Sequence, residues 1–180
     1  IDIKRKEDRK GGERITVLGE MKFEGEDITN TEPDERVKKG IVLSRERHPI
    51  FPDSSVEENL KIAAYIRWGP EVKKIFEFVY TVFFHLKEIK KRKAGFCSGG
   101  EQQMLAIARV LRSKTSFILL DEPTEGLAPM LIKAIEAILN NIKKERITLL
   151  LVEQNTRFAQ KVANRHYILS NGEIVYTGSN

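Results

Sequence analysis

The chain has 180 residues, a formal net charge of +5 at pH 7 and a hydrophobic fraction of 41%. Such a length can bury one substantial core with room for a small subdomain. The single cysteine excludes an internal disulfide and fits a reducing compartment, no apolar stretch is long enough to cross a bilayer, and the basic runs lack the aromatic partners of a nucleic-acid surface.

The first half of the chain predicts a strand followed by a helical region. A buried strand is expected at residues 41–43, and the pattern is wholly helical at residues 56–93. Apolar residues recur at helical spacing over residues 72–86, and Pro70 suits a first helical turn. Three aromatic residues lie off this stripe: Phe78, Tyr80 and Phe84. They indicate either a broader buried face or a contact surface for a partner.

The residues with the clearest chemistry begin at residues 96–103, which read Phe-Cys-Ser-Gly-Gly-Glu-Gln-Gln. Ser98 and Glu101 have the spacing of a capping box, which predicts that a helix begins there. The free N–H groups and the positive end of the helix dipole at such a start can hold an anion. We expect Cys97 to fill a small apolar slot, although a thiol beside a helix terminus can also be reactive.

A second informative run is the apolar strand expected at residues 117–120, which ends in Asp121, Glu122 and Pro123. Buried strands rarely end in two adjacent carboxylates for stability alone. A carboxylate pair at the carboxyl edge of a parallel sheet suits a metal ion and a water molecule. This strand end is therefore a candidate catalytic edge.

The last third of the chain predicts a helix, a third buried strand and a hairpin. Pro129 is expected to open a helix, and its inward stripe is Ile132, Ile135, Ile138, Leu139 and Ile142. A buried strand is expected at residues 148–152. Asn171-Gly172 between two apolar runs is a strong hairpin signal. The three histidines, His48, His85 and His166, show no metal-ligand spacing, so we expect surface or satisfied roles for them.

Together, residues 96–103 and 117–123 resemble the signature motif and the Walker B strand of the nucleotide-binding domain of ABC transporters. Residues 123–129 and 149–155 add two further matches. The last of these, with residues 50–53 and 56–60, resembles the branched-chain amino-acid importer subgroup. The resemblance implies an α/β fold like that of P-loop NTPases: a mostly parallel sheet flanked by helices, a small helical subdomain and an antiparallel hairpin near the C-terminus.

By this resemblance the ATPase core comprises residues 1–55 and 96–180, and the helical subdomain comprises residues 56–95. One departure is large, because no G-x-x-x-x-G-K-[ST] motif occurs and the phosphate-binding loop is absent between Gly19 and Glu20. Either the loop belongs to the protein but not to the printed sequence, or Gly19 and Glu20 form a tight turn between two strands. The family-like residues on both sides favour the first interpretation.

The resemblance also implies roles for individual residues. Asp121 is expected to hold Mg²⁺, and Glu46 to be a second Mg²⁺ ligand, at a position where the wider family has glutamine. Glu122 is expected to polarise the attacking water. Gln154 occupies the switch position that is normally histidine. A glutamine there can donate a hydrogen bond to a γ-phosphate but cannot shuttle a proton.

The signature motif contributes the remaining site residues. Ser98, Gly99, Gly100 and Glu101 are expected to bind ATP held by the opposite subunit, because the family closes as a head-to-tail dimer. The expected function is thus the ATP-binding and ATP-hydrolysing subunit of an ABC-type importer, most like those for branched-chain amino acids. Its expected location is the cytoplasmic face of the cell membrane, as a homo- or heterodimer bound to transmembrane permease subunits and with no nucleic-acid partner.

Two other functions stay open. The chain could be a non-catalytic or fragmentary interaction domain that has lost its phosphate-binding loop. A soluble ABC ATPase acting on ribosomes or DNA would share the motifs, but the importer-like runs at residues 126–129 and 152–155 and the lack of long inserted helices disfavour it.

Overall fold

The computed structural model describes residues 19–44, 50–64, 71–111 and 115–179. The chain divides into two compact units, Ile1–Arg36 and Val37–Asn180. Pro70, which the sequence places in a first helical turn, lies outside the described residues. No helix of the described part is both long and apolar enough to cross a membrane.

In the first unit, β1 (Lys22–Phe23) and β2 (Glu26–Asp27) form a short antiparallel ribbon. The turn between them is left-handed at both residues, with φ of 51° at Glu24 and 83° at Gly25, the pattern of a type I′ turn. Thr29 closes the ribbon, because its hydroxyl accepts a hydrogen bond of 2.8 Å from the Met21 N–H. The helix α2 (Pro33–Lys38) follows.

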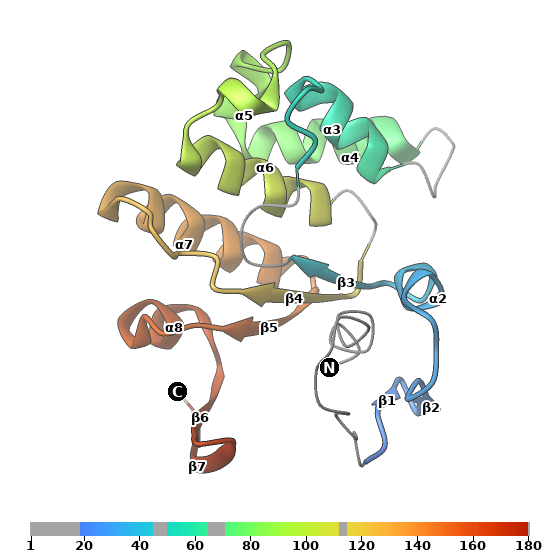
Figure 1. The fold of residues 1–180 in the computed structure, drawn as a ribbon, viewed down its shortest axis with the longest axis vertical. Helices are drawn as coiled ribbons and strands as arrows, with labels where there is room; N and C mark the ends of the chain where they lie inside the picture. Colours follow the sequence, from blue (N-terminus) through green and yellow to red (C-terminus); the bar gives the residue numbers. More distant parts are fainter. Residues whose placement is uncertain (1–18, 45–49, 65–70, 112–114, 180) are drawn as a thin grey trace, which may run out of the picture. The chain divides into compact units, whose positions relative to one another are not determined.

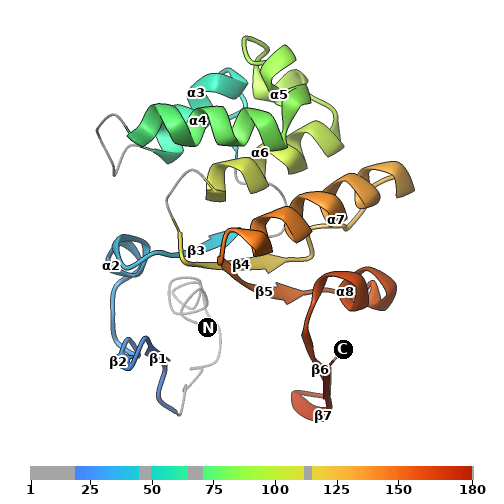
Figure 2. The same ribbon diagram turned by 180° about the vertical axis from the view of Figure 1, so that it is seen from behind.

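The second unit is built on a parallel sheet. The strands β3 (Ile41–Ser44), β4 (Phe117–Asp121) and β5 (Thr148–Val152) lie in the order β3-β4-β5, and both pairings are parallel. The three strands lie where the sequence predicts them, but only β3 and β4 contain buried residues. β5 alternates between exposed and half-buried residues, so the expectation that it is buried is wrong. Figures 1 and 2 show α6 (Gly99–Leu111) and α7 (Pro129–Lys144) on the same side of this sheet. Parallel strands need such crossover helices, which confirms the α/β fold class.

The core of this unit lies where α6 and α7 meet the sheet. Four residues of the predicted inward stripe of α7 are buried: Ile135, Ile138, Leu139 and Ile142. They belong to the same hydrophobic cluster as Ile118 and Leu120 of β4. Burial of these aliphatic side chains is the main stabilising term of the sheet–helix layer.

The described part of residues 56–93 contains the helices α3 (Val56–Ala63), α4 (Glu71–Val82) and α5 (Phe84–Glu88), and the short η2 (Ala94–Phe96) follows. The sequence predicts one continuous stripe, but the helix breaks at Phe83, where φ is −116° and ψ is 60°. The stripe survives the break, because Val79, Phe83 and Leu86 are all buried. Apolar spacing alone cannot reveal a one-residue departure from helical geometry that leaves Val79, Phe83 and Leu86 in the core.

The two ends of this helical region pair with each other. Ser55 and Lys93 form an isolated antiparallel bridge, and the Val56 N–H donates to the Arg92 carbonyl at 3.0 Å. Of the three off-stripe aromatic residues, Phe84 is 68% exposed, whereas Phe78 and Tyr80 are half-buried. The partner-contact interpretation therefore concerns Phe84 alone.

The last elements are α8 (Thr156–Val162) and the hairpin of β6 (Arg165–Ser170) and β7 (Glu173–Ser179). Asn171 and Gly172 have φ of 49° and 83°, and Ser170 pairs with Glu173 across the turn. Both central residues are left-handed, which confirms the hairpin predicted from Asn-Gly.

Candidate functional site

The start of α6 has the predicted capping box. The Glu101 N–H donates to Ser98 Oγ at 3.3 Å, and the Ser98 N–H donates to Glu101 Oε2 at 2.7 Å. Ser98 is exposed, while the Glu101 side chain is only 13% exposed. The helix therefore begins at a fixed place, and its first N–H groups lie beside an accessible hydroxyl.

The two glycines of this motif have different surroundings. A Cβ at Gly99 would have no atom within 4 Å, so space is open on that side of the helix start. A Cβ at Gly100 would overlap Cδ1 of Leu131 in α7. Gly100 thus permits close packing of two helices, and Gly99 leaves room for a ligand at the N-terminal end.

The acidic strand end lies at the carboxyl edge of β4. Asp121 is exposed and pairs in register with Val152 of β5. Glu122 is half-buried, its N–H donates to the Val152 carbonyl at 2.9 Å, and its φ is 45°. A non-glycine residue at such a φ is uncommon and is often found at functional sites.

The structure brings Glu122 and Gln154 together. Gln154 Nε2 donates to Glu122 Oε1 at 2.7 Å, although the residues are 32 positions apart. This contact is possible because β4 and β5 are adjacent parallel strands whose carboxyl ends meet at one edge. Because the amide of Gln154 binds only one oxygen of the carboxylate, the second oxygen can accept a hydrogen bond from a water molecule.

Sequence reasoning missed two contacts that hold the loop after Glu122. Gln103 Nε2 of α6 donates to the Pro123 carbonyl at 2.8 Å. Glu153 Oε1 accepts from the Thr124 N–H at 3.0 Å and from the Thr124 hydroxyl at 2.6 Å. Gln103 and Thr124 are both buried. The signal available in the sequence was a glutamine at a position on the apolar face of the helix, since a polar side chain buried there needs a hydrogen-bond partner.

A charged cluster surrounds Glu101, and its members were also missed. His85 Nε2 lies 2.8 Å from Glu101 Oε1, and Arg92 Nη1 donates to the same oxygen at 3.2 Å. The hydrogen bond with Glu101 raises the pKa of His85. Burial opposes the ionisation of Glu101, but hydrogen bonds from His85 and Ser98 outweigh it, so the pKa of Glu101 is lowered. Burial raises the pKa of the Cys97 thiol, which supports the apolar-slot interpretation.

The expected Mg²⁺ ligands are only partly described. Asp121 fits the role, because it is an exposed carboxylate at the end of a buried strand. Glu46 lies outside the described residues. Within the described ranges no group of three or more histidine, cysteine, aspartate or glutamate side chains is arranged to hold a metal ion. Mg²⁺ typically takes one or two carboxylates and completes its shell with phosphates and water.

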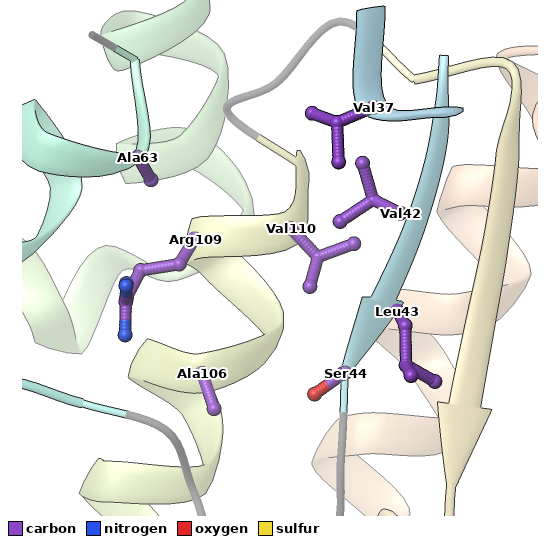
Figure 3. Close-up of a pocket in the computed structure, with 8 residues that line it drawn as sticks. All are labelled: Val37, Val42, Leu43, Ser44, Ala63, Ala106, Arg109 and Val110. Atoms are coloured by element: carbon purple, nitrogen blue, oxygen red, sulfur yellow. The ribbon is translucent and has the colours of Figure 1, made fainter. Parts of the chain in front are cut away.

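A cavity of about 180 Å³ lies between α6 and β3, lined by Val37, Val42, Leu43, Ser44, Ala63, Ala106, Arg109 and Val110 (Figure 3). Its lining is apolar apart from the Ser44 hydroxyl and the Arg109 guanidinium. Arg109 lies 4.9 Å from the centre of the Phe51 ring, and burial lowers the pKa of its guanidinium. None of the described residues with a predicted catalytic role lines this cavity.

Comparison with known families gives a match to the model of the ABC transporter family over residues 12–125. The branched-chain amino-acid transport ATP-binding protein BraG of Pseudomonas aeruginosa is 40% identical over 164 residues, covering 91% of this chain and 70% of that protein. The probable branched-chain protein LivF of Archaeoglobus fulgidus is 40% identical over 165 residues, covering 89% and 69%.

A further relative is named for export, and a solved structure allows the fold to be compared. The lipopolysaccharide export ATP-binding protein LptB of Haemophilus influenzae is 30% identical over 163 residues, covering 89% of this chain and 68% of that protein. A crystal structure of the ADP conformation of MJ1267, an ATP-binding cassette of an ABC transporter, superposes with a TM-score of 0.73 at 30% identity, covering 88% of this chain and 68% of that one. The fold and the sequence thus point to the same family.

Proposed function

Because this chain belongs to the ABC transporter family of ATP-binding proteins, we propose that it is the ATP-hydrolysing subunit of a membrane importer for branched-chain amino acids. The proposal is supported by two relatives at 40% identity whose names state that transport role. The export relative, at 30% identity, makes the direction of transport a point that needs its own test.

The proposed catalytic residues are Glu122 and Gln154, whose side chains are joined by a hydrogen bond. Glu122 polarises the attacking water, and Gln154 orients the carboxylate and donates to the γ-phosphate. Asp121, with Glu46, holds Mg²⁺, which would neutralise charge on the triphosphate. The observation that carries this assignment is the left-handed Glu122 at an exposed strand end, held from β5 by Gln154.

The signature residues serve the second subunit. Ser98, Gly99, Gly100 and Glu101 form the capped start of α6, and we assign it to the γ-phosphate of ATP bound in the opposite subunit. Open space at Gly99 and the exposure of Ser98 support this assignment. The two subunits, identical or different, then close on two ATP molecules and reopen after hydrolysis.

The remaining partner is the membrane permease, which would place the subunit at the inner face of the cell membrane. We propose residues 56–95 as the helical subdomain that meets the permease, and residues 1–55 and 96–180 as the ATPase core. The pairing of Ser55 with Lys93 supports the first boundary, since it closes the helical segment at its base. The exposed ring of Phe84 is the proposed contact residue.

The test is ATP-dependent uptake of radiolabelled leucine, isoleucine and valine into vesicles that contain the chain with its permease and partner subunits. Wild type is expected to accumulate the label, and Glu122→Gln to abolish accumulation. Lys161→Gln, which removes a surface ion pair with Glu136, is the matched control. Efflux instead of uptake, or uptake of none of the three, would reject the importer assignment.

A second candidate function follows from the phosphate-binding loop that the sequence does not contain. A chain that keeps the surfaces of an ABC domain without binding its own nucleotide would act as an interaction module. It would co-purify with permease subunits and leave ATP hydrolysis unaffected when Glu122 is replaced by Gln.

A further inference from the structure

We propose that His85 and Arg92 are positioning residues that hold Glu101 and, through it, fix the place of Ser98 at the start of α6. The inference rests on the proposed function, because Ser98 is assigned there to the γ-phosphate of ATP in the opposite subunit. The set of His85, Glu88, Arg92 and Glu101 is called the brace below.

The carboxylate of Glu101 joins three parts of the chain. Its Oε1 accepts from His85 Nε2 of α5 at 2.8 Å and from Arg92 Nη1 of the following loop at 3.2 Å. Its Oε2 accepts from the Ser98 N–H at 2.7 Å. The two oxygens belong to one rigid carboxylate. A shift of Oε1, which His85 and Arg92 hold, therefore also shifts Oε2, which holds the Ser98 N–H.

The geometry at His85 favours the doubly protonated imidazolium. Nε2 lies 2.8 Å from Glu101 Oε1, and Nδ1 lies 3.1 Å from Glu88 Oε2. A neutral imidazole has one N–H, so one of the two carboxylates would then face a lone pair. Among the described residues, the charged groups facing His85 are Glu88 from α5 and Glu101 from α6, and Arg92 binds the same Glu101 oxygen as His85. The raised pKa of His85 agrees with this arrangement.

Protonation of His85 also balances the charge beside the proposed phosphate site. With His85 protonated, two cations and two carboxylates cancel. When His85 loses its proton, the brace carries one net negative charge, and one N–H of the ring is lost, so Glu88 and Glu101 compete for the single remaining donor. Both changes act in the same direction, because a looser Ser98 and a more negative surrounding each weaken the binding of an anion. The affinity of the helix start for phosphate is therefore expected to fall as the pH rises through the pKa of His85.

The brace can be tested on the full chain without nucleotide. With ¹³C-labelled histidine, an NMR titration can follow all three histidines, and His85→Gln identifies the signal of His85. The pKa of His85 is expected above the free-histidine range and is expected to fall in Glu101→Gln. At a fixed pH, His85→Gln is expected to speed amide exchange at Ser98 severalfold, and His85→Lys, which keeps a cation, is expected to restore protection.

The matched control is Lys161→Gln, which removes the 3.3 Å ion pair with Glu136 and is expected to leave Ser98 exchange unchanged. A pKa of His85 at or below the free-histidine range would overturn the proposal. Ser98 exchange that is equal in wild type, His85→Gln and Arg92→Gln would overturn it as well.

A last measurement separates the brace from the proposed function. In the assembled transporter, ATP hydrolysis by wild type is expected to decline as the pH rises through the pKa of His85, and His85→Lys to remove that decline. If Ser98→Ala abolishes hydrolysis but the His85 variants keep the wild-type pH profile, the positioning role is wrong. If Ser98→Ala also has no effect while the amide-exchange results hold, the phosphate assignment of Ser98 is wrong and the brace is structural.

Discussion

Gln154 donates a hydrogen bond of 2.7 Å to Glu122, so the two residues proposed for catalysis are in contact although they follow different strands, β5 and β4. The backbone supports the same contact, because the Glu122 N–H donates to the Val152 carbonyl at 2.9 Å. Glu122 is thus held from β5 by both its side chain and its main chain. A carboxylate restrained in this way needs little reorganisation when a water molecule approaches.

Gln154→Ala is expected to lower kcat about 100-fold, the lower end of the usual contribution of a positioned acid–base group. Without the amide, Glu122 loses the donor that orients it. Gln154→His offers an N–H at the same place and is expected to retain more activity than the alanine variant. Steady-state ATP hydrolysis by the assembled transporter measures both. Equal rates for Gln154→Ala and wild type would contradict a catalytic role.

Glu153→Ala is expected to destabilise the chain by about 1–3 kcal/mol, the usual cost of leaving buried polar groups without partners. Glu153 accepts two hydrogen bonds from Thr124, which is 5% exposed. Urea unfolding followed by circular dichroism gives the free-energy difference. Glu145→Ala, at the C-cap of α7, is a control for replacing a glutamate elsewhere.

A double-mutant cycle isolates this contact. Thr124→Val removes the hydroxyl, so the added effect of Glu153→Ala is expected to be smaller in that background. Full additivity of the two substitutions would show that the side chains do not interact in solution.

The two glycines of the signature run are expected to respond differently to alanine. Gly99→Ala meets no atom in the folded chain, so stability is expected to stay within about 1 kcal/mol of wild type while ATP hydrolysis by the assembled transporter falls. Gly100→Ala overlaps Leu131 and is expected to cost about 1–3 kcal/mol, as overpacking does. Thermal unfolding and ATPase rates, measured on both variants, distinguish a ligand-facing glycine from a packing glycine.

The contribution of His85 to stability is expected to depend on pH. Its folded-state pKa is raised above the ordinary value of 6.5, so its stabilising effect is fully present below that value and is lost as the pH rises through the folded-state pKa. The difference in Tm between wild type and His85→Gln should therefore be largest at acidic pH and should shrink under alkaline conditions. A difference that grows with pH would contradict the assigned sign.

The 180 residues as printed are expected to bind ATP weakly when alone. No G-x-x-x-x-G-K-[ST] motif supplies the N–H groups and lysine that stabilise the β- and γ-phosphates. Equilibrium titration of the isolated chain with labelled ATP tests this expectation, and micromolar binding would refute it.

The local patterns of this sequence predicted the elements that carry the site. The spacing of Ser98 and Glu101 predicted the capping box, the apolar run ending at Asp121 predicted β4, and Asn171-Gly172 predicted the hairpin. Each signal lies within a few residues, where spacing and turn chemistry decide the conformation. The family resemblance added separate roles for Glu122 and Gln154, and the strand order places the two residues in contact.

The contacts that were missed are those between distant residues. His85 was expected to be a surface or satisfied histidine, and nothing near it in the sequence indicates Glu101, 16 positions away. The link of Thr124 with Glu153 spans 29 positions. Such pairs depend on how helices and strands pack, and a single sequence does not record that packing.

Gln103 has a mechanical consequence. It lies in α6, one helical turn from the start of the helix, and its side-chain amide donates a hydrogen bond to the carbonyl of Pro123, the residue after Glu122. Because a helix is stiff, a displacement of the start of α6, near Ser98, is expected to move the loop after Glu122 as well. Movement of the start of α6 would therefore reach the loop after Glu122 through the buried side chain of Gln103.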